Sequence, residues 1–222
     1  MRFLQLTFFL FLAHFSHAQN LVVSCAFENV RSDQLDELVY NYNFSRTFLK
    51  VQQPFLRNGL SVTFSSINNT AKNIQKGFQI SYSRIGSSVV NDGFTNTFAM
   101  HLLKPGYIIR CGFPAKMNRL YADVCMSGTF YTLVRSQNKV PNRYYDRHSV
   151  AIGAGAEIGL RISYSLNTNR HYLISPFIGT AYVPYIFSPR NEVIINQTKG
   201  LFDNKYISML SMQLGFSVML NR

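Results

Sequence analysis

The sequence lacks the features that mark a charged soluble domain or a helical membrane protein. Charged residues make up only 14% of its 222 residues, against about 25% in ordinary soluble domains, and tryptophan is absent. Beyond the N-terminal segment, no stretch reaches the ~18 consecutive apolar residues that a transmembrane helix needs. Any crossing of a membrane must therefore be made by strands.

Motifs for cofactors are missing as well. The chain has no glycine-rich phosphate loop, no nucleotide fingerprint and no cluster of metal ligands, so we expect no cofactor and no metal. Its three cysteines, an odd number, cannot all be paired within one chain. The alternation around Cys111 and Cys125 places them on opposite faces of neighbouring strands, which argues against a bond between them. The sequence leaves the state of these two and of Cys25 open.

The N-terminus has the pattern of a secretory signal peptide. Arg2 supplies the positive charge, residues 3–13 are largely apolar, and Ser16-His17-Ala18 is a small-x-small cleavage site. We therefore expect a signal peptide over 1–18. A lead-in segment over 19–37 and a barrel domain over 38–222 are expected to follow.

The stretch 149–166 carries the clearest pattern. Its even-numbered residues from Val150 to Leu166 are all apolar, and the odd-numbered ones are small, polar or charged. This period of two places the two sets on opposite faces of a long strand. The polar face holds only Glu157 and Arg161 as charges, which suits the narrow interior of a small barrel. We therefore expect the apolar face to contact lipid; a soluble lipocalin-like barrel, with that face inward, is the alternative.

The same alternation predicts most of the remaining strands. Within 97–113, however, the apolar positions change from even to odd at Lys104-Pro105-Gly106. A β-bulge there would keep the apolar face toward lipid. Besides 149–166, strands are predicted at 59–66, 77–83, 97–113, 120–135, 172–187 and 206–220.

The loops predict how the strands are ordered. Long polar loops are expected at 85–96, 137–148 and 188–204, alternating with shorter turns, as the outer loops and periplasmic turns of barrels do. Seven strands follow Gly59, so an even total requires one more before it. Residues 38–44 are the first candidate. If 32–44 form a helix instead, 21–27 or part of 188–198 must supply the eighth strand.

Together these features resemble the small outer-membrane β-barrels of Gram-negative bacteria, such as the transmembrane domain of the OmpA family. The resemblance rests on the signal peptide, the aromatic-rich alternating strands and the closing strand over 214–220. It implies an all-β, closed, antiparallel up-and-down barrel of about eight strands in an outer membrane. The chain departs from the pattern by ending Leu220-Asn221-Arg222 rather than in an aromatic residue.

Four charged residues are expected to face the lumen: Glu157, Arg161, Asp123 and Arg110. An eight-stranded interior is filled by side chains, and charges buried there need partners. We therefore expect a charge network that plugs the barrel. A narrow pore is the alternative.

The net charge of +12 is expected to lie in surface loops near lipid phosphates. The partners implied are outer-membrane lipid and other envelope proteins, since no nucleic-acid motif is present. The basic residues assigned to these loops are Arg135, Lys139, Arg143, Arg147, Arg190 and Lys199.

A lipid-modifying barrel enzyme is a further alternative, with His148, Ser149 and Glu157 as its polar triad. Adjacent His148 and Ser149 point to opposite faces of a strand, which is poor geometry for a base and a nucleophile. Glu157 lies about 30 Å further along at ~3.3 Å per residue. We therefore expect no catalytic residues and a structural or surface-interaction role.

Overall fold

A computed structural model describes residues 20–44, 50–71, 73–91, 93–113, 119–139, 144–167, 172–187 and 206–221. The predicted signal peptide lies outside them. The elements in chain order are β1 (Asn20–Arg31), α2 (Asp33–Phe44), β2 (Asn58–Ala71), β3 (Ile74–Asn91), β4 (Phe94–Gly112), β5 (Leu120–Lys139), β6 (Tyr144–Tyr164), β7 (Leu166–Asn167), β8 (Tyr172–Phe187) and β9 (Tyr206–Asn221).

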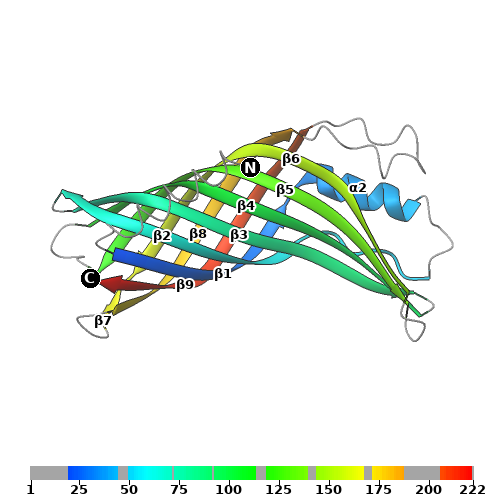
Figure 1. The fold of residues 1–222 in the computed structure, drawn as a ribbon, viewed down its shortest axis with the longest axis horizontal. Coiled ribbons are helices and arrows are strands. Elements are labelled where there is room, and N and C mark those ends of the chain that lie inside the picture. The colour runs from blue at the N-terminus through cyan, green and yellow to red at the C-terminus, as the bar shows by residue number, and fades with distance from the viewer. Residues whose placement is uncertain are drawn as a thin grey trace, which may run out of the picture.

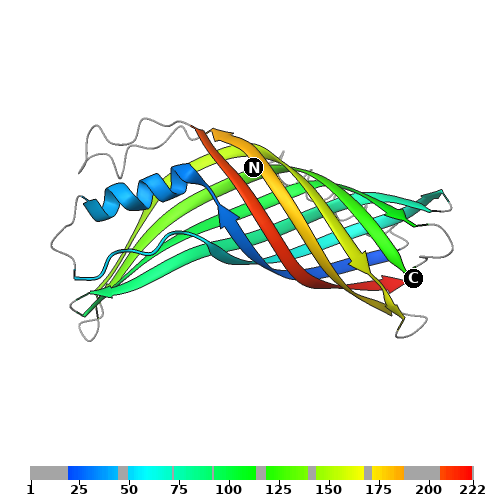
Figure 2. The same ribbon diagram turned by 180° about the vertical axis from the view of Figure 1, so that it is seen from behind.

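Eight long strands close into an up-and-down barrel (Figures 1 and 2). Their order around the barrel is β6-β5-β4-β3-β2-β1-β9-β8, and an additional β6–β8 pairing closes the sheet. Every pairing is antiparallel. The two-residue β7 extends the β6 side along β8. This architecture confirms the fold class predicted from the sequence.

The first strand comes earlier in the chain than predicted, and the residues proposed for it are helical. Residues 20–31 form β1, which pairs with both β2 and β9, so the predicted 19–37 lead-in segment is wrong. Residues 38–44 are helical, and of the alternatives left open it is 21–27 that supplies the eighth strand. The Ser32 hydroxyl accepts a hydrogen bond from the Leu35 amide at 3.3 Å, which is an N-cap that begins α2.

Helix α2 has 12 residues. No described helix is long and apolar enough to cross a bilayer.

The apolar face of the long strands points outward, as predicted. On β6, Ile158 and Leu160 are 56% and 46% exposed, and on β9 Phe216 is 63% exposed. Glu157 and Arg161, on the opposite face of β6, have partners inside the barrel. A wall of exposed apolar side chains around a polar interior is the arrangement expected of a barrel in lipid.

The predicted bulge at Lys104-Pro105-Gly106 is absent. The register between β3 and β4 runs without a shift through these residues, from Leu103 opposite Tyr82 to Gly106 opposite Gln79. The switch of the apolar residues from even-numbered to odd-numbered positions has another cause. Phe98, Met100 and Leu102 face inward and belong to a buried apolar cluster, whereas the odd-numbered residues after Gly106 face outward.

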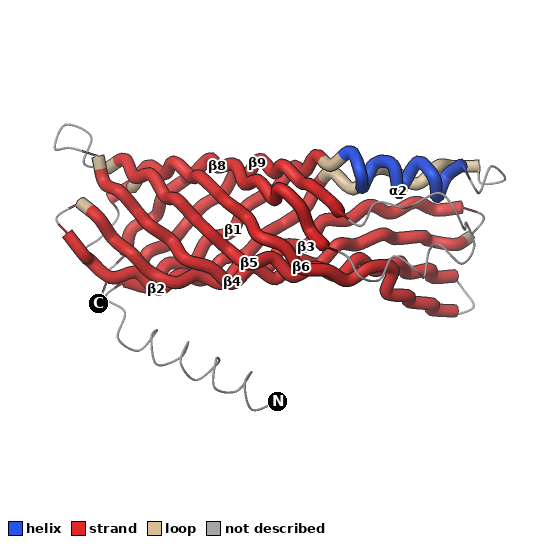
Figure 3. Tube along the Cα trace, turned by 90° about the horizontal axis from the view of Figure 1, so that it is seen from above, coloured by secondary structure: helices blue, strands red, loops and turns tan. Residues whose placement is uncertain are grey.

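Two predicted outer loops are largely strand. β3 continues to Asn91 and β4 begins at Phe94, with Gly93 at a positive φ of 80° in the tight turn. Likewise, β5 and β6 extend into the predicted loop 137–148. At the end of the barrel where α2 lies, these four strands run past their neighbours as a curved sheet with α2 lying alongside (Figure 3). The backbone pairing continues in this extension although the sequence there loses its alternation.

The end of the barrel where α2 lies is closed by a buried apolar cluster, which we call the outer cap. Helix α2 supplies four of its members and the inner faces of the strands supply most of the rest. Leu35, Val39 and Phe98 are fully buried in it, and the Tyr42 ring meets the Phe98 ring edge to face at 4.9 Å. The outer cap consists of Val30, Leu35, Leu38, Val39, Tyr42, Leu56, Ile85, Phe98, Met100, Leu102, Tyr131, Leu133, Val183, Ile186, Ile207 and Met209.

Candidate functional site

Below the outer cap, the lumen is lined mainly by small hydroxyl side chains. Alternation in every strand brings these residues inward, and they are short enough to fill a narrow barrel. Thr63 and Ser81 share a hydrogen bond of 2.8 Å between their hydroxyls, and the Gln79 amide donates to Ser127 at 3.2 Å. The buried hydroxyl residues of the lumen include Ser24, Ser61, Thr63, Ser65, Ser81, Ser83, Ser127, Thr129, Ser163 and Ser217.

Arg110 and Asp123 form a two-pronged ion pair. They lie directly opposite each other on β4 and β5. Arg110 donates from Nε to one carboxylate oxygen of Asp123 at 2.7 Å and from Nη2 to the other at 2.8 Å. Both side chains are more than nine-tenths buried. Bidentate pairing is the geometry in which a guanidinium binds a carboxylate best.

Lys104 forms the centre of a second charged group. Its ammonium lies 3.0 Å from Glu157 and 3.7 Å from Glu28. Glu28 also accepts hydrogen bonds from the Gln213 amide at 2.7 Å and from the Ser83 hydroxyl at 3.2 Å. One cation thus bridges two carboxylates that come from distant parts of the chain.

Arg161 joins this second group through Gln213. Its Nε donates to Gln213 Oε1 at 3.2 Å, and its guanidinium lies over the Phe177 ring at 5.2 Å. The four predicted lumen residues therefore all point inward but fall into two groups. Arg110 pairs with Asp123, and among the described residues Glu157 connects to Arg161 through Lys104, Glu28 and Gln213.

Sequence reasoning missed Lys104 and Glu28. Lys104 was assigned to a bulge, and Glu28 lay in the segment expected to precede the barrel. With both included, three acidic residues (Glu28, Asp123, Glu157) balance three basic ones (Lys104, Arg110, Arg161). Such balance is what a buried set of charges requires.

One cavity of the described lumen, bounded by Glu28, Lys104, Glu157 and the underside of the outer cap, has a volume of about 10 Å³, which is room for one water molecule at most. A second apolar cluster, Val22, Ile67, Ile108, Cys125 and Met219, lies toward the end of the barrel where β1 begins. Apolar packing therefore lies on both sides of the Lys104 group.

The predicted basic loops are only partly described. Arg135 is not in a loop: it lies on β5 with its guanidinium over the ring of Tyr42 on α2, at 5.4 Å, and so it helps to hold the outer cap. Lys139 and Arg147 lie on strands β5 and β6 rather than in loops. Arg143, Arg190 and Lys199 lie outside the described residues.

The three residues of the alternative enzyme site lie on β6. Glu157 is bound to Lys104, and His148 and Ser149 lie in β6 opposite Arg135 and Val134. Among the described residues, no group of three or more His, Cys, Asp or Glu side chains could hold a metal ion.

His101 and the three cysteines lie outside both charged groups. His101 lies on the outer face, where its Nδ1 is 2.6 Å from the Tyr82 hydroxyl. The cysteines are free: Cys25 and Cys111 are exposed and Cys125 is buried. The expectation that Cys111 and Cys125 face opposite ways is therefore confirmed.

Solved structures of the same shape share little sequence with this chain. Neisserial surface protein A matches with a TM-score of 0.50 at 10% identity, covering 91% of this chain and 96% of that one. For the attachment invasion locus protein Ail of Yersinia pestis the TM-score is 0.44 at 8% identity, over 90% and 97% of the two chains. For the outer membrane protein OprG of Pseudomonas aeruginosa it is 0.40 at 12% identity, over 92% and 97%.

No protein-family model and no curated protein matches the sequence. The likeness to Neisserial surface protein A nevertheless agrees with the closed ring of eight strands, and it confirms the resemblance drawn from the sequence. The chain has the fold of the small eight-stranded outer-membrane β-barrels.

Proposed function

We propose that this protein is a non-enzymatic, non-conducting barrel of an outer membrane that carries a structured cap at its outer end. Its role is structural or one of interaction at the cell surface. The observation that carries the proposal is the packing of side chains inside the described part of the barrel. Two ion-paired groups and the outer cap occupy the interior, and the cavity between them holds one water molecule at most.

A location in the membrane is supported by the outer wall. Exposed large apolar residues follow the outward faces of all eight long strands, including Phe27, Phe64, Phe78, Leu103, Met126, Leu160, Ile178 and Phe216. Burial of such a surface in lipid is favourable, whereas its exposure to water is not.

The orientation is supported by the connections. The longest described connection, between β1 and β2, carries α2 and lies at the same end as the extended hairpins. At the other end, the connections after β2 and β4 have two and seven residues, far fewer than the connection that carries α2. Since small barrels place their longer connections outside the cell and short turns in the periplasm, α2 and the hairpins are assigned to the outer side.

A surface-interaction role is supported by the outer side of α2 and the segment after it. There Tyr40 and Phe44 are 61% and 64% exposed, and Val51 and Phe55 are 51% and 44% exposed. The Tyr40 and Phe44 rings stack with their centres 6.4 Å apart. Aromatic side chains displayed in this way are typical of surfaces that bind other molecules; envelope proteins are the partners we infer.

Conductance tests the proposal. The folded protein is inserted into planar bilayers at neutral pH, and single-channel currents are recorded. We expect no current above the bilayer background. Glu157→Gln is the matched variant, because it removes one charge from the lumen and keeps the volume of the side chain. It is also expected to conduct nothing while lowering the unfolding temperature.

A steady current through the wild-type barrel that changes with Glu157→Gln would contradict the closed lumen. That outcome would favour the narrow pore.

A further inference from the structure

A groove of about 400 Å³ opens on the outer wall of the barrel near its outer end. It exists because two neighbouring strands have different lengths. The pairing of β2 with β3 begins at Gly59 opposite Ile85, yet β3 continues to Asn91. Beyond Ile85, β3 therefore has no strand on that side. The segment before β2 covers part of the gap through a hydrogen bond of 2.9 Å from the Gln53 amide to Ser87.

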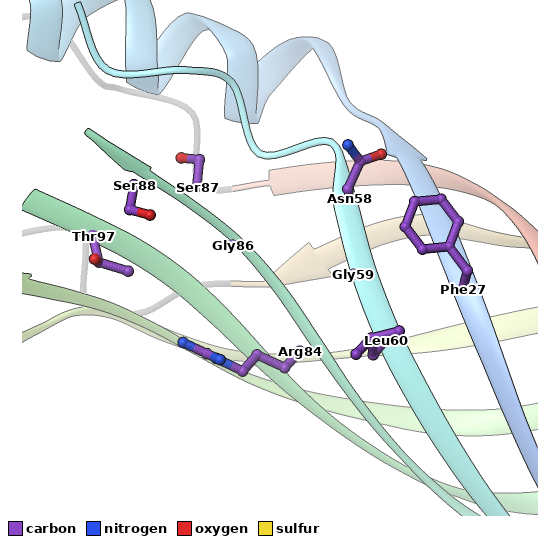
Figure 4. A pocket seen from close by; sticks show the side chains of 9 residues that line it. All are labelled: Phe27, Asn58, Gly59, Leu60, Arg84, Gly86, Ser87, Ser88 and Thr97. Atoms are coloured by element: carbon purple, nitrogen blue, oxygen red, sulfur yellow. The ribbon is translucent and has the colours of Figure 1, made fainter. Parts of the chain in front are cut away.

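The two walls of the groove differ in chemistry. Phe27 and Leu60, from β1 and β2, form an apolar wall and are 49% and 68% exposed. The other wall, from β3 and β4, carries Arg84 with the hydroxyls of Ser88 and Thr97. Figure 4 shows Arg84 extending toward Thr97, on the side away from Phe27 and Leu60.

The position of Arg84 along β3 places it at the boundary of the lipid-facing band. The outward residues of this strand run from Lys76 through three apolar side chains to Arg84. Eight steps at ~3.3 Å give about 27 Å along the strand, or about 20 Å of height at the usual tilt. An apolar band is about 25 Å tall, so Lys76 and Arg84 lie near its two edges, and Arg84 lies at the edge nearer α2, where the headgroups begin.

Arg84 has nothing to neutralise it within the described chain. It makes no hydrogen bond or ion pair with any other described residue, and it is exposed. A guanidinium at this level favours a phosphate, which it can bind through two parallel hydrogen bonds. The apolar wall beside it continues directly into the lipid-facing surface.

We propose that this groove binds one phosphate-bearing membrane lipid. Arg84 pairs with the phosphate, Ser88 and Thr97 donate hydrogen bonds to the headgroup, and the first part of an acyl chain lies on Phe27 and Leu60. The proposal rests on the proposed membrane location.

Retention of lipid by the purified barrel tests it. The protein is folded into vesicles containing equal amounts of phosphatidylglycerol and of diacylglycerol, which has the same chains without the phosphate. It is then extracted in detergent and weighed by native mass spectrometry. We expect one retained phosphatidylglycerol and no retained diacylglycerol. Arg84→Gln is expected to lower retention about ten-fold, since a charge-assisted hydrogen bond is lost.

Two further variants distinguish binding in the groove from a general attraction of lipid phosphates to basic residues. Ser88→Trp keeps Arg84 but fills the groove, and it should lower retention as much as Arg84→Gln. Lys76→Gln removes an exposed outward charge at the opposite boundary, and it should leave retention unchanged.

Three results would each overturn the proposal. Arg84→Gln could retain as much lipid as wild type, Lys76→Gln could lose as much lipid as Arg84→Gln, or the barrel could retain diacylglycerol. Displacement of the lipid by inorganic phosphate at the same concentration would also overturn it, because the apolar wall would then contribute nothing. Heat-modifiable gel mobility of the same samples reports insertion separately. If the wild type fails to fold into vesicles, the result counts against the membrane location. If it folds but retains no lipid, the result counts against the lipid site in the groove alone.

Discussion

At the scale of single residues, the lumen is stabilised by charges that are buried and matched. Arg110 and Asp123 are the simplest case, because the two side chains satisfy each other through two hydrogen bonds. Within the described chain, Arg110 also contacts the Met219 sulfur at 3.8 Å and lies over the Tyr121 ring at 5.7 Å, and neither of these partners is an anion. Loss of the carboxylate would leave a guanidinium buried with no opposite charge.

Asp123→Asn should therefore destabilise the barrel by about 3–5 kcal/mol, the usual cost of breaking a buried ion pair. The measurement is equilibrium urea unfolding in detergent micelles, followed by gel mobility. The double variant Arg110→Met/Asp123→Leu is the control: replacing both partners by apolar residues of similar size should cost much less. If the single variant proves as stable as wild type, the ion pair has no structural role.

Which residues face the lumen could be predicted from the sequence where the alternation is regular. Glu157, Arg161 and Asp123 follow from parity alone. The partners of Glu157 and Arg161 could not be predicted, because Lys104, Glu28 and Gln213 come from other strands, and side-chain contact across a barrel leaves no periodic signal. The parity of β8 is hidden for a different reason. Its register shifts between Val183 and Ile186, so the inward positions change from odd to even.

At the scale of elements, α2 fills the outer end of the barrel with apolar side chains. Four strands extend beyond the others, and the helix packs against the inner face of that extension. Arg57, directly before β2, donates a hydrogen bond of 2.5 Å to Asp36 of α2. This bond ties the start of β2 to the helix. The helix is therefore a structural part of the barrel rather than an appendage.

Leu35→Ala should loosen this cap. Leu35 is completely buried, and truncation of such a residue costs about 2–5 kcal/mol. Hydrogen exchange of the α2 amides in the folded barrel measures the effect, and it should become faster. Tyr40→Ala, at a 61% exposed position of the same helix, is the control and should change stability by less than about 0.5 kcal/mol. Equal exchange in the two variants would mean that α2 does not depend on the core.

The elements of the membrane-spanning part could be predicted, and those outside it largely could not. Between two lipid-facing boundaries a strand must alternate, so β6 and β9 are visible in the sequence. Above the boundary that constraint ends. The strand extensions at 85–91 and 137–139 therefore resemble loops. Phe98, Met100 and Leu102 resemble lipid-facing residues although they belong to the outer cap with the residues of α2. Residues 38–44 satisfy both a helical and a strand pattern, and only the packing into the cap decides between them.

At the scale of the whole molecule, the account depends on which way the two faces of the sheet point. Apolar side chains face lipid, and small hydroxyls with matched charges fill the lumen. Phe216 and Phe177 represent the two faces at nearly the same depth, because β9 and β8 pair through Pro176 opposite Phe216 and Phe177 opposite Gly215. Phe216 is 63% exposed and Phe177 is 5% exposed.

Single tryptophans at these two positions provide the most direct test, since the chain has no tryptophan of its own. Phe216→Trp and Phe177→Trp are folded into vesicles whose acyl chains carry bromine, and the quenching of fluorescence is compared with that in unbrominated vesicles. The account predicts strong quenching of the tryptophan at position 216 and little quenching at position 177. Strong quenching at position 177 with none at 216 would contradict it.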